Sequence, residues 1–102
     1  FEFFPRRAPR FEVIINDVLK ALTPKTRMVV LSNLHNPSGV LVDVEVLAAL
    51  AETLNDRNVL LLIDEVYQDY AGIGAAGLDV ERHPNVIRIG SMTKTFGLNA
   101  LR

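Results

Sequence analysis

The sequence has no cysteine and no tryptophan, and it has only two histidines among its 102 residues. Without cysteine the chain can form neither a disulfide framework nor a thiolate metal site, and it offers no thiol nucleophile. His35 and His83 lie far apart in the sequence, so they do not form a pair with the short spacing that is typical of zinc ligands. No metal site is therefore expected.

Long apolar segments are absent as well. Short runs such as Val59–Ile63 fall far below the roughly 20 residues that are needed to cross a bilayer. The apolar start of the chain also lacks the preceding basic region of a secretory signal. We therefore expect a cytoplasmic protein with no membrane partner.

An overall excess of one charge is missing too, because the formal net charge is −1. The chain thus has no general attraction to nucleic acid, and no nucleic-acid partner is expected. Charge is nevertheless unevenly distributed, with a net +3 over residues 1–42, −8 over residues 43–81 and +4 over residues 82–102. One interpretation is a solvated acidic face with chance clustering of charge, and the other is that the basic end of the chain contacts a small anion.

The hydrophobic content of 49% is that of a packed domain. Continuous apolar runs predict buried strands over residues 27–33, 58–64 and 85–91, covered on both faces as in a parallel sheet. Helical spacing of apolar residues predicts a helix over 43–56 with Asp43 as its N-cap, and a shorter helix over 17–22 that is capped by Asn16 and ended by Thr23-Pro24. Glycines predict a loop, of a kind that can move, over 71–78. Strand–helix–strand order indicates an α/β fold with right-handed parallel crossovers.

Polar residues follow each predicted strand at its carboxyl end, where open α/β sheets bind their ligands. We expect these side chains to converge: Asn36, Asp64, Tyr67, Ser91 and Lys94. Taken singly, Asn-Pro-Ser-Gly is ordinary β-turn chemistry and a lone lysine in a Ser/Thr/Gly turn is ordinarily a surface residue. The occurrence of all three segments in this order, each at a strand end, indicates a binding site.

One interpretation of the second segment is a nucleotide hydrolase, in which Asp64 after an aliphatic strand would hold Mg²⁺. Such enzymes carry a Gly-x4-Gly-Lys-Ser/Thr loop upstream of the acidic strand. No such loop is present, and Gly90-Ser-Met-Thr-Lys94-Thr95 lacks the second glycine and follows the acidic strand. This alternative is weakened but stays open.

Three stretches together resemble the class I/II aminotransferases, a family of pyridoxal-phosphate-dependent enzymes of fold type I. The stretches are Leu31-Ser-Asn-Leu-His-Asn-Pro-Ser-Gly39, Leu62-Ile-Asp-Glu-Val-Tyr67 and Ser91-Met-Thr-Lys-Thr-Phe-Gly-Leu-Asn-Ala-Leu-Arg102. The similarity runs from about Phe11 to Arg102. It implies a parallel-strand α/β/α segment of the large domain that binds the cofactor.

The resemblance assigns chemistry to two residues. Lys94 would bond covalently to the aldehyde of pyridoxal 5'-phosphate and then move the α-proton of the substrate as base and acid. Asp64 would face the pyridine nitrogen and keep it protonated, since opposite charges in contact favour both charged forms. A protonated ring is the stronger electron sink.

The resemblance gives the other candidates a holding role. Asn36 and Tyr67 would hydrogen-bond the 3-oxygen of the ring, and Ser91 and Arg102 would hold the phosphate, for which the planar donors of arginine are suited. Thr93 is a further phosphate or supporting candidate, and His35 is interpreted as a flanking structural residue. A cis peptide is expected at Asn36–Pro37.

The family pattern also predicts that residues 1–102 form a single partial domain, the central part of the large domain. The family's upstream glycine-rich phosphate turn, its ring-stacking aromatic residue and its downstream substrate-binding arginine have no counterpart here. The parent would be an aminotransferase, a homodimer acting on an amino acid and a 2-oxo acid, and the isolated chain would be inactive and would self-associate. The alternatives to a transaminase are a C–S lyase, a decarboxylase, a non-catalytic module with the same fold, and the nucleotide hydrolase described above.

Overall fold

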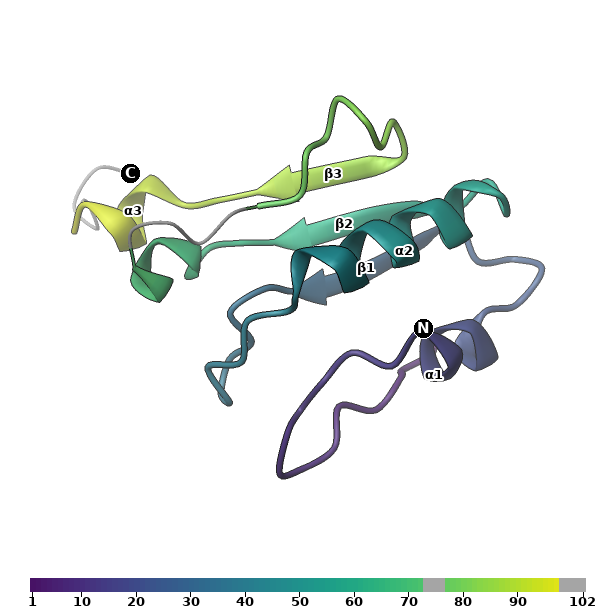
Figure 1. Cartoon of the computed structure of the whole chain (residues 1–102), viewed down its shortest axis with the longest axis horizontal. Helices are drawn as coiled ribbons and strands as arrows, with labels where there is room; N and C mark the ends of the chain where they lie inside the picture. The colour runs from purple at the N-terminus through teal and green to yellow at the C-terminus, as the bar shows by residue number, and fades with distance from the viewer. Residues whose placement is uncertain (73–76, 98–102) are drawn as a thin grey trace.

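The computed structural model describes residues 1–72 and 77–97, and its centre is a sheet of three parallel strands (Figure 1). The strands are β1 (Met28–Ser32), β2 (Leu60–Asp64) and β3 (Val86–Ile89), and they lie in the order β1-β2-β3. All three fall within the stretches predicted from apolar runs. The predicted α/β class and parallel topology are confirmed.

Within these described ranges, four helical segments accompany the sheet: α1 (Ile15–Ala21), α2 (Val44–Asn55), the 3-10 helix η1 (Gln68–Ala71) and the short α3 (Met92–Thr95). Asp43 occupies the N-cap position of α2 as predicted, although its side chain makes no capping hydrogen bond. The prediction for α1 was wrong at its start, because the N-cap is Ile14 and Asn16 lies inside the first turn. There the main chain enters the helix from an extended conformation with no side-chain cap.

The core lies between α2 and one face of the sheet, as Figure 1 shows. Leu47, Leu50 and Leu54 recur at helical spacing on α2, and each is fully buried. They pack with Leu61 and Ile63, alternate residues of β2 that share one face of the strand. Burial of each such side chain contributes about 1.5–3 kcal/mol to folding, so this contact fixes α2 on the sheet.

The opposite face of the sheet carries apolar side chains that the described residues do not bury. The exposed fraction is 57% for Val30 and 42% for Ile89, and Met28, Leu60 and Ile87 are similarly exposed. The sequence predicts cover on both faces, whereas within residues 1–72 and 77–97 the cover of α2 lies on one face only. We call this apolar surface the open sheet face.

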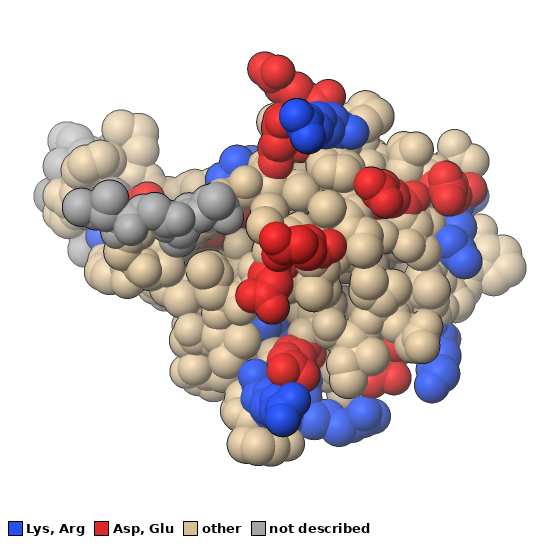
Figure 2. All heavy atoms as spheres, in the orientation of Figure 1, with Lys and Arg blue, Asp and Glu red and all other residues tan. Residues whose placement is uncertain are grey.

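Charge is distributed over the surface much as it is along the sequence. Figure 2 shows acidic side chains spread over the side on which α2 lies, with lysine and arginine mostly near its lower and right margins. Most acidic residues of the block are exposed, in line with the interpretation of a solvated face, whereas Glu65 is buried. No helix in the described ranges is long and apolar enough to span a membrane.

Candidate functional site

The carboxyl ends of the three strands lie level with one another, which places the predicted segments at one edge of the sheet (Figure 1). In the ladder, Ser32 pairs with Asp64, and Asp64 pairs with Ile89. The loop after β1, the turn after β2 and helix α3 all begin beyond this level. The structure therefore confirms the convergence of the three segments that parallel topology predicts.

The loop after β1, which carries Asn36, is tied to the sheet by a buried side chain. Asn33 is 1% exposed, and its Oδ1 accepts hydrogen bonds from the backbone N–H of Leu34 (3.2 Å) and Val42 (3.0 Å). The Asn36–Pro37 peptide is cis, as the family resemblance implies, and the loop exposes the side chain of Asn36. The predicted turn is present, with Gly39 at a φ of +69°, a conformation that favours glycine.

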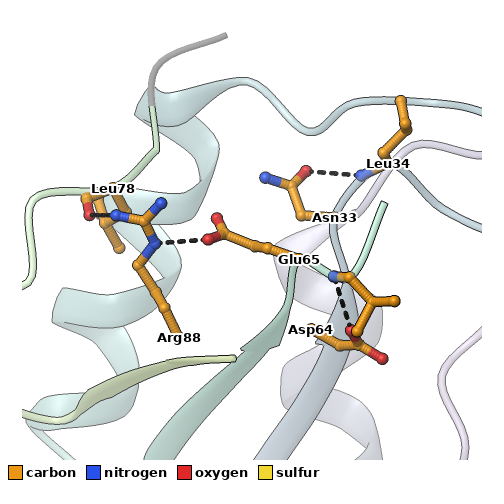
Figure 3. Close-up of polar contacts among 7 residues, drawn as sticks. Asn33, Leu34, Asp64, Glu65, Leu78 and Arg88 are labelled. Carbon is orange, nitrogen blue, oxygen red and sulfur yellow. Dashed lines mark hydrogen bonds and ion pairs between the residues drawn. The ribbon is translucent and has the colours of Figure 1, made fainter. Parts of the chain in front are cut away.

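Asp64 is the last residue of β2, and one of its carboxylate oxygens accepts a hydrogen bond from the main chain. Its Oδ1 accepts a hydrogen bond from the backbone N–H of Val66 (3.0 Å), which is drawn in Figure 3. No described residue donates to Oδ2, and the side chain is only partly buried. The carboxylate is thus oriented by the main chain and keeps acceptor capacity for a ligand.

Lys94 lies in α3 and meets two tyrosines from the turn after β2. Its Nζ is 5.8 Å from the centroid of the Tyr67 ring, and its backbone oxygen accepts a 2.6 Å hydrogen bond from the hydroxyl of Tyr70. The Tyr67 and Tyr70 rings lie 6.2 Å apart at an angle of 50°. Within the described part of the chain, Lys94 forms no ion pair. The structure thus brings Tyr67 and Lys94 together, as the sequence predicts.

The structure locates one of the two predicted phosphate residues. Ser91 occupies the N-cap position of α3, and its Oγ lies 2.7 Å from Oγ1 of Thr93. The two hydroxyls therefore lie within hydrogen-bond distance of each other. The other residue, Arg102, lies outside the described residues, as does part of the predicted glycine loop, residues 73–76.

His35 stands beside the site in a cluster with Arg6 and Phe11. Its Nδ1 is 2.8 Å from Oγ of Ser38, and its ring stacks on Phe11 at a centroid distance of 6.3 Å. Arg6 donates hydrogen bonds to the backbone oxygens of Phe11 (2.7 Å) and Ser32 (3.0 Å). Desolvation by burial, and secondarily the charge of Arg6, lower the pKa of His35 from its ordinary value.

Two contacts in this region were not predicted from the sequence, one made by Tyr70 and one made by Glu65. Tyr70 follows Tyr67 by three residues, a spacing that places two side chains on one side of a helical turn and could have signalled the pair. Glu65 binds Arg88 across 23 positions, and no local pattern announces such a contact. Short α3 was also missed, because four residues show no periodicity.

These residues gather several different polar groups at one edge of the sheet. An amine lies over a phenol ring, a carboxylate with a spare oxygen ends the central strand, and a pair of hydroxyls precedes the amine. Such a set can bind a ligand through a nucleophilic amine, a hydrogen-bond-accepting carboxylate and a pair of hydroxyl groups.

Comparisons with known proteins agree with this geometry. The model of the family described as aminotransferase class I and II matches residues 1–102. A histidinol-phosphate aminotransferase of Legionella pneumophila is 34% identical over 95 residues, which are 90% of this chain and 26% of that protein. The chain therefore spans about a quarter of the length of the curated relatives that it matches.

Solved structures show the same fold. An Escherichia coli protein with a methionine aminotransferase function superposes with a TM-score of 0.78 and 25% identity, covering 93% of this chain and 26% of that one. A pyridoxal-phosphate-bound C–S lyase from Staphylococcus hominis gives a TM-score of 0.71 and 26% identity, covering 89% of this chain and 25% of that one. With its whole length matched by the family model, and with this fold, the chain belongs to the class I and II aminotransferase family.

Proposed function

We propose that the chain is the central part of the large, cofactor-binding domain of a pyridoxal-phosphate-dependent aminotransferase. The observation that carries the proposal is the position of Lys94, whose Nζ lies over the Tyr67 ring, next to the strand that ends in Asp64. An amine without an ion pair in the described ranges suits covalent attachment to an aldehyde better than a lysine bound to a carboxylate would.

Each residue of the site has a role in this proposal. Lys94 would hold the cofactor covalently until the amino group of the substrate replaces its own, and the freed amine would then move a proton at the α-carbon of the substrate. Asp64 would bind the ring nitrogen through its carboxylate. Tyr67 and Asn36 donate to the 3-oxygen of the ring. Ser91 and Arg102 hold the phosphate, with Thr93 supporting the hydroxyl of Ser91 at 2.7 Å. When bound, the cofactor supplies an electron sink for the substrate carbanion.

The parent enzyme in this proposal transfers an amino group between an amino acid and a 2-oxo acid. It is a cytoplasmic homodimer, and the 102-residue chain alone is inactive because substrate-binding groups lie elsewhere in the parent. The proposal does not specify the amino donor, because one similar protein is named for histidinol phosphate and another for methionine. Light scattering of the full-length protein tests the dimer, and a mass of one subunit would contradict it.

Borohydride trapping tests the cofactor and its lysine. The full-length protein is incubated with pyridoxal phosphate, reduced and digested, and the pyridoxyl group is mapped by mass spectrometry. We expect the adduct on Lys94, its loss in Lys94→Ala and its retention in Lys25→Ala. Lys25 is the control because it is exposed and precedes β1, away from the carboxyl ends of the strands. A folded protein with no adduct on any lysine would refute the proposal.

A second candidate function is elimination at a carbon–sulfur bond. It is favoured by the similarity to the Staphylococcus hominis C–S lyase, which shares the fold over 89% of this chain. Fold alone does not determine which reaction follows cofactor attachment. The two functions are separated by incubating the loaded full-length protein with an S-alkyl cysteine. Thiol release without a 2-oxo acid acceptor indicates a lyase, whereas product formation that requires the acceptor indicates a transaminase.

The remaining alternatives have less support. The family match gives no support to the nucleotide-hydrolase interpretation. A decarboxylase or a non-catalytic module with this fold would still bind the cofactor through Lys94. Borohydride trapping would therefore not distinguish either of them from an aminotransferase, and a test of the reaction is needed. Carbon dioxide release from amino acids would identify the decarboxylase, and cofactor binding without turnover of any amino acid would identify the module.

A further inference from the structure

A second carboxylate, that of Glu65, directly follows Asp64 but points to the opposite side of the sheet. Figure 3 shows the two side chains directed away from each other, as expected for successive residues at the end of a strand. The Glu65 side chain is only 7% exposed. The roles proposed above for the site do not use it, so this buried charge calls for a separate explanation.

Glu65 is held by two groups from different parts of the chain. Nε of Arg88 donates to its Oε2 at 2.6 Å, and the amide of Gln68, oriented with its nitrogen toward the carboxylate, donates to the same oxygen at 3.1 Å. Nη1 of Arg88 also donates to the backbone oxygen of Leu78 at 3.2 Å. Glu65 thus joins β3, the loop before it and the start of η1.

The space around Arg88 is shaped for its guanidinium. A Cβ added at Gly77 would collide with the end of the Arg88 side chain. The loop therefore lies so close to the guanidinium that a larger residue at this position would force Arg88 to shift. The Arg88 side chain is 35% exposed, so the guanidinium is fastened at the edge of the core and not free in solvent.

The same turn presents the N–H group that orients Asp64. Glu65 begins the turn: its backbone N–H donates to the oxygen of Ile89 (2.7 Å), and its own oxygen accepts from the N–H of Gln68 (3.0 Å). Between these fixed points lies Val66, whose N–H donates to Oδ1 of Asp64 at 3.0 Å. The direction of the Asp64 carboxylate therefore depends on the turn that Glu65 anchors.

We propose that Glu65 and Arg88 are positioning residues, which hold the turn after β2 so that Val66 aims the Asp64 carboxylate at the cofactor ring. This inference rests on the proposed function. Charge-assisted hydrogen bonds are short and directional, so the pair fixes the turn more firmly than neutral groups would. Loss of Arg88 leaves a buried carboxylate without its charged partner, and the turn then opens to hydrate it. Val66 moves off Asp64 as a result.

A double-mutant cycle in the full-length protein tests this coupling. The dissociation constant of pyridoxal phosphate is measured for Arg88→Ala, for Asp64→Ala and for the double variant. We expect Arg88→Ala to weaken binding about tenfold, as the loss of a supporting partner does at other preorganised sites. In the Asp64→Ala background the same substitution should change binding less than twofold, because Arg88 acts through Asp64. An equal loss in both backgrounds would overturn the proposal.

A matched control and a milder variant separate positioning from folding. Arg82 forms an exposed ion pair with Asp79 at 3.3 Å, and Arg82→Ala should leave cofactor affinity unchanged. Arg88→Lys keeps the charge balance but cannot reproduce the planar pair of donors to Glu65 and Leu78. It should keep the unfolding midpoint within a few degrees while it weakens binding about threefold. Wild-type affinity in Arg88→Lys and in any folded Arg88→Ala would overturn the proposal.

The proposed function and the positioning role are contradicted by different results. If borohydride traps no cofactor on Lys94 of the wild-type protein, the proposed function is refuted and the positioning role falls with it. If the wild-type protein is trapped normally and Arg88→Ala binds cofactor as tightly as Arg82→Ala does, only the positioning role is refuted.

Discussion

The hydroxyl of Tyr70 donates a 2.6 Å hydrogen bond to the backbone oxygen of Lys94, and this contact joins the turn after β2 to α3. Tyr70 itself is 64% exposed, so the contact lies at the surface of the site. It fixes the main chain of the residue whose side chain is proposed to carry the cofactor. Tyr70 therefore ties α3 to the segment that follows β2.

Tyr70→Phe should loosen α3 while keeping the ring next to Tyr67. A hydrogen bond of this kind contributes about 1 kcal/mol, and we expect cofactor trapping on Lys94 in the full-length protein to slow by about fivefold. The rate is measured by quenching the reaction with borohydride at successive times. Tyr70→Ala, which also removes the ring contact, should slow trapping further, and a wild-type rate in both variants would contradict this role.

Asn33→Ala should destabilise the protein by about 2 kcal/mol, because the backbone N–H groups of Leu34 and Val42 would lose their shared acceptor inside the core. The free energy of unfolding is measured by urea titration of the full-length protein. Asn55→Ala is the control, since Asn55 is exposed at the end of α2 and should change stability by less than about 0.5 kcal/mol. Equal effects of the two substitutions would count against the proposed role of Asn33.

His35 should make the protein less stable at acid pH. Its pKa in the folded state lies below the ordinary 6.5, so the unfolded chain binds the proton more tightly between these two pKa values. The contribution of neutral His35 is thus complete above about pH 6.5 and is lost as the pH falls toward the pKa of the folded state. Between pH 7 and pH 5, the wild-type protein should lose more stability than His35→Gln.

Titration of His35 by nuclear magnetic resonance tests the cause of this shift. Because Arg6 is the secondary cause after desolvation, Arg6→Gln should raise the pKa of His35 only part of the way to its ordinary value. An unshifted His35 in the wild-type protein would contradict the prediction.

The isolated 102-residue chain should self-associate through the open sheet face. Val30 is 57% exposed there, and large apolar patches of this kind drive association. Val30→Lys should shift the chain toward the monomer in size-exclusion chromatography at tens of micromolar. Ala49→Lys adds the same charge on the exposed side of α2 and should leave the elution volume unchanged. A monomeric wild-type chain would argue against the prediction.

Much of the fold could be predicted from the sequence, because short-range patterns determine it. The run from Leu60 to Asp64 and the helical spacing of Leu47, Leu50 and Leu54 give β2 and α2 almost at their observed bounds. Parallel topology then places Asp64 and Lys94 at the same edge. The start of α1 at Ile15 was not predictable in this way, since no side chain caps it.

The contacts that refine the site escaped prediction because they depend on the register between strands. Arg88 reaches Glu65 only because β2 and β3 pair Ile63 with Arg88 and Asp64 with Ile89. A one-residue shift would place Arg88 elsewhere, and no local pattern in the sequence reports that shift. Arg102 lies outside the described residues, so its role stays a prediction.

The three strands end at the same level of the sheet, and this alignment determines at which positions the chain can accept inserted residues. An inserted residue within β2 would turn Asp64 to the other face of the sheet, since side chains alternate along a strand. An insertion among residues 79–84, by contrast, would lengthen a surface loop before β3 and leave the ladder intact. Related sequences of different length should therefore differ in their loops and keep each strand at constant length.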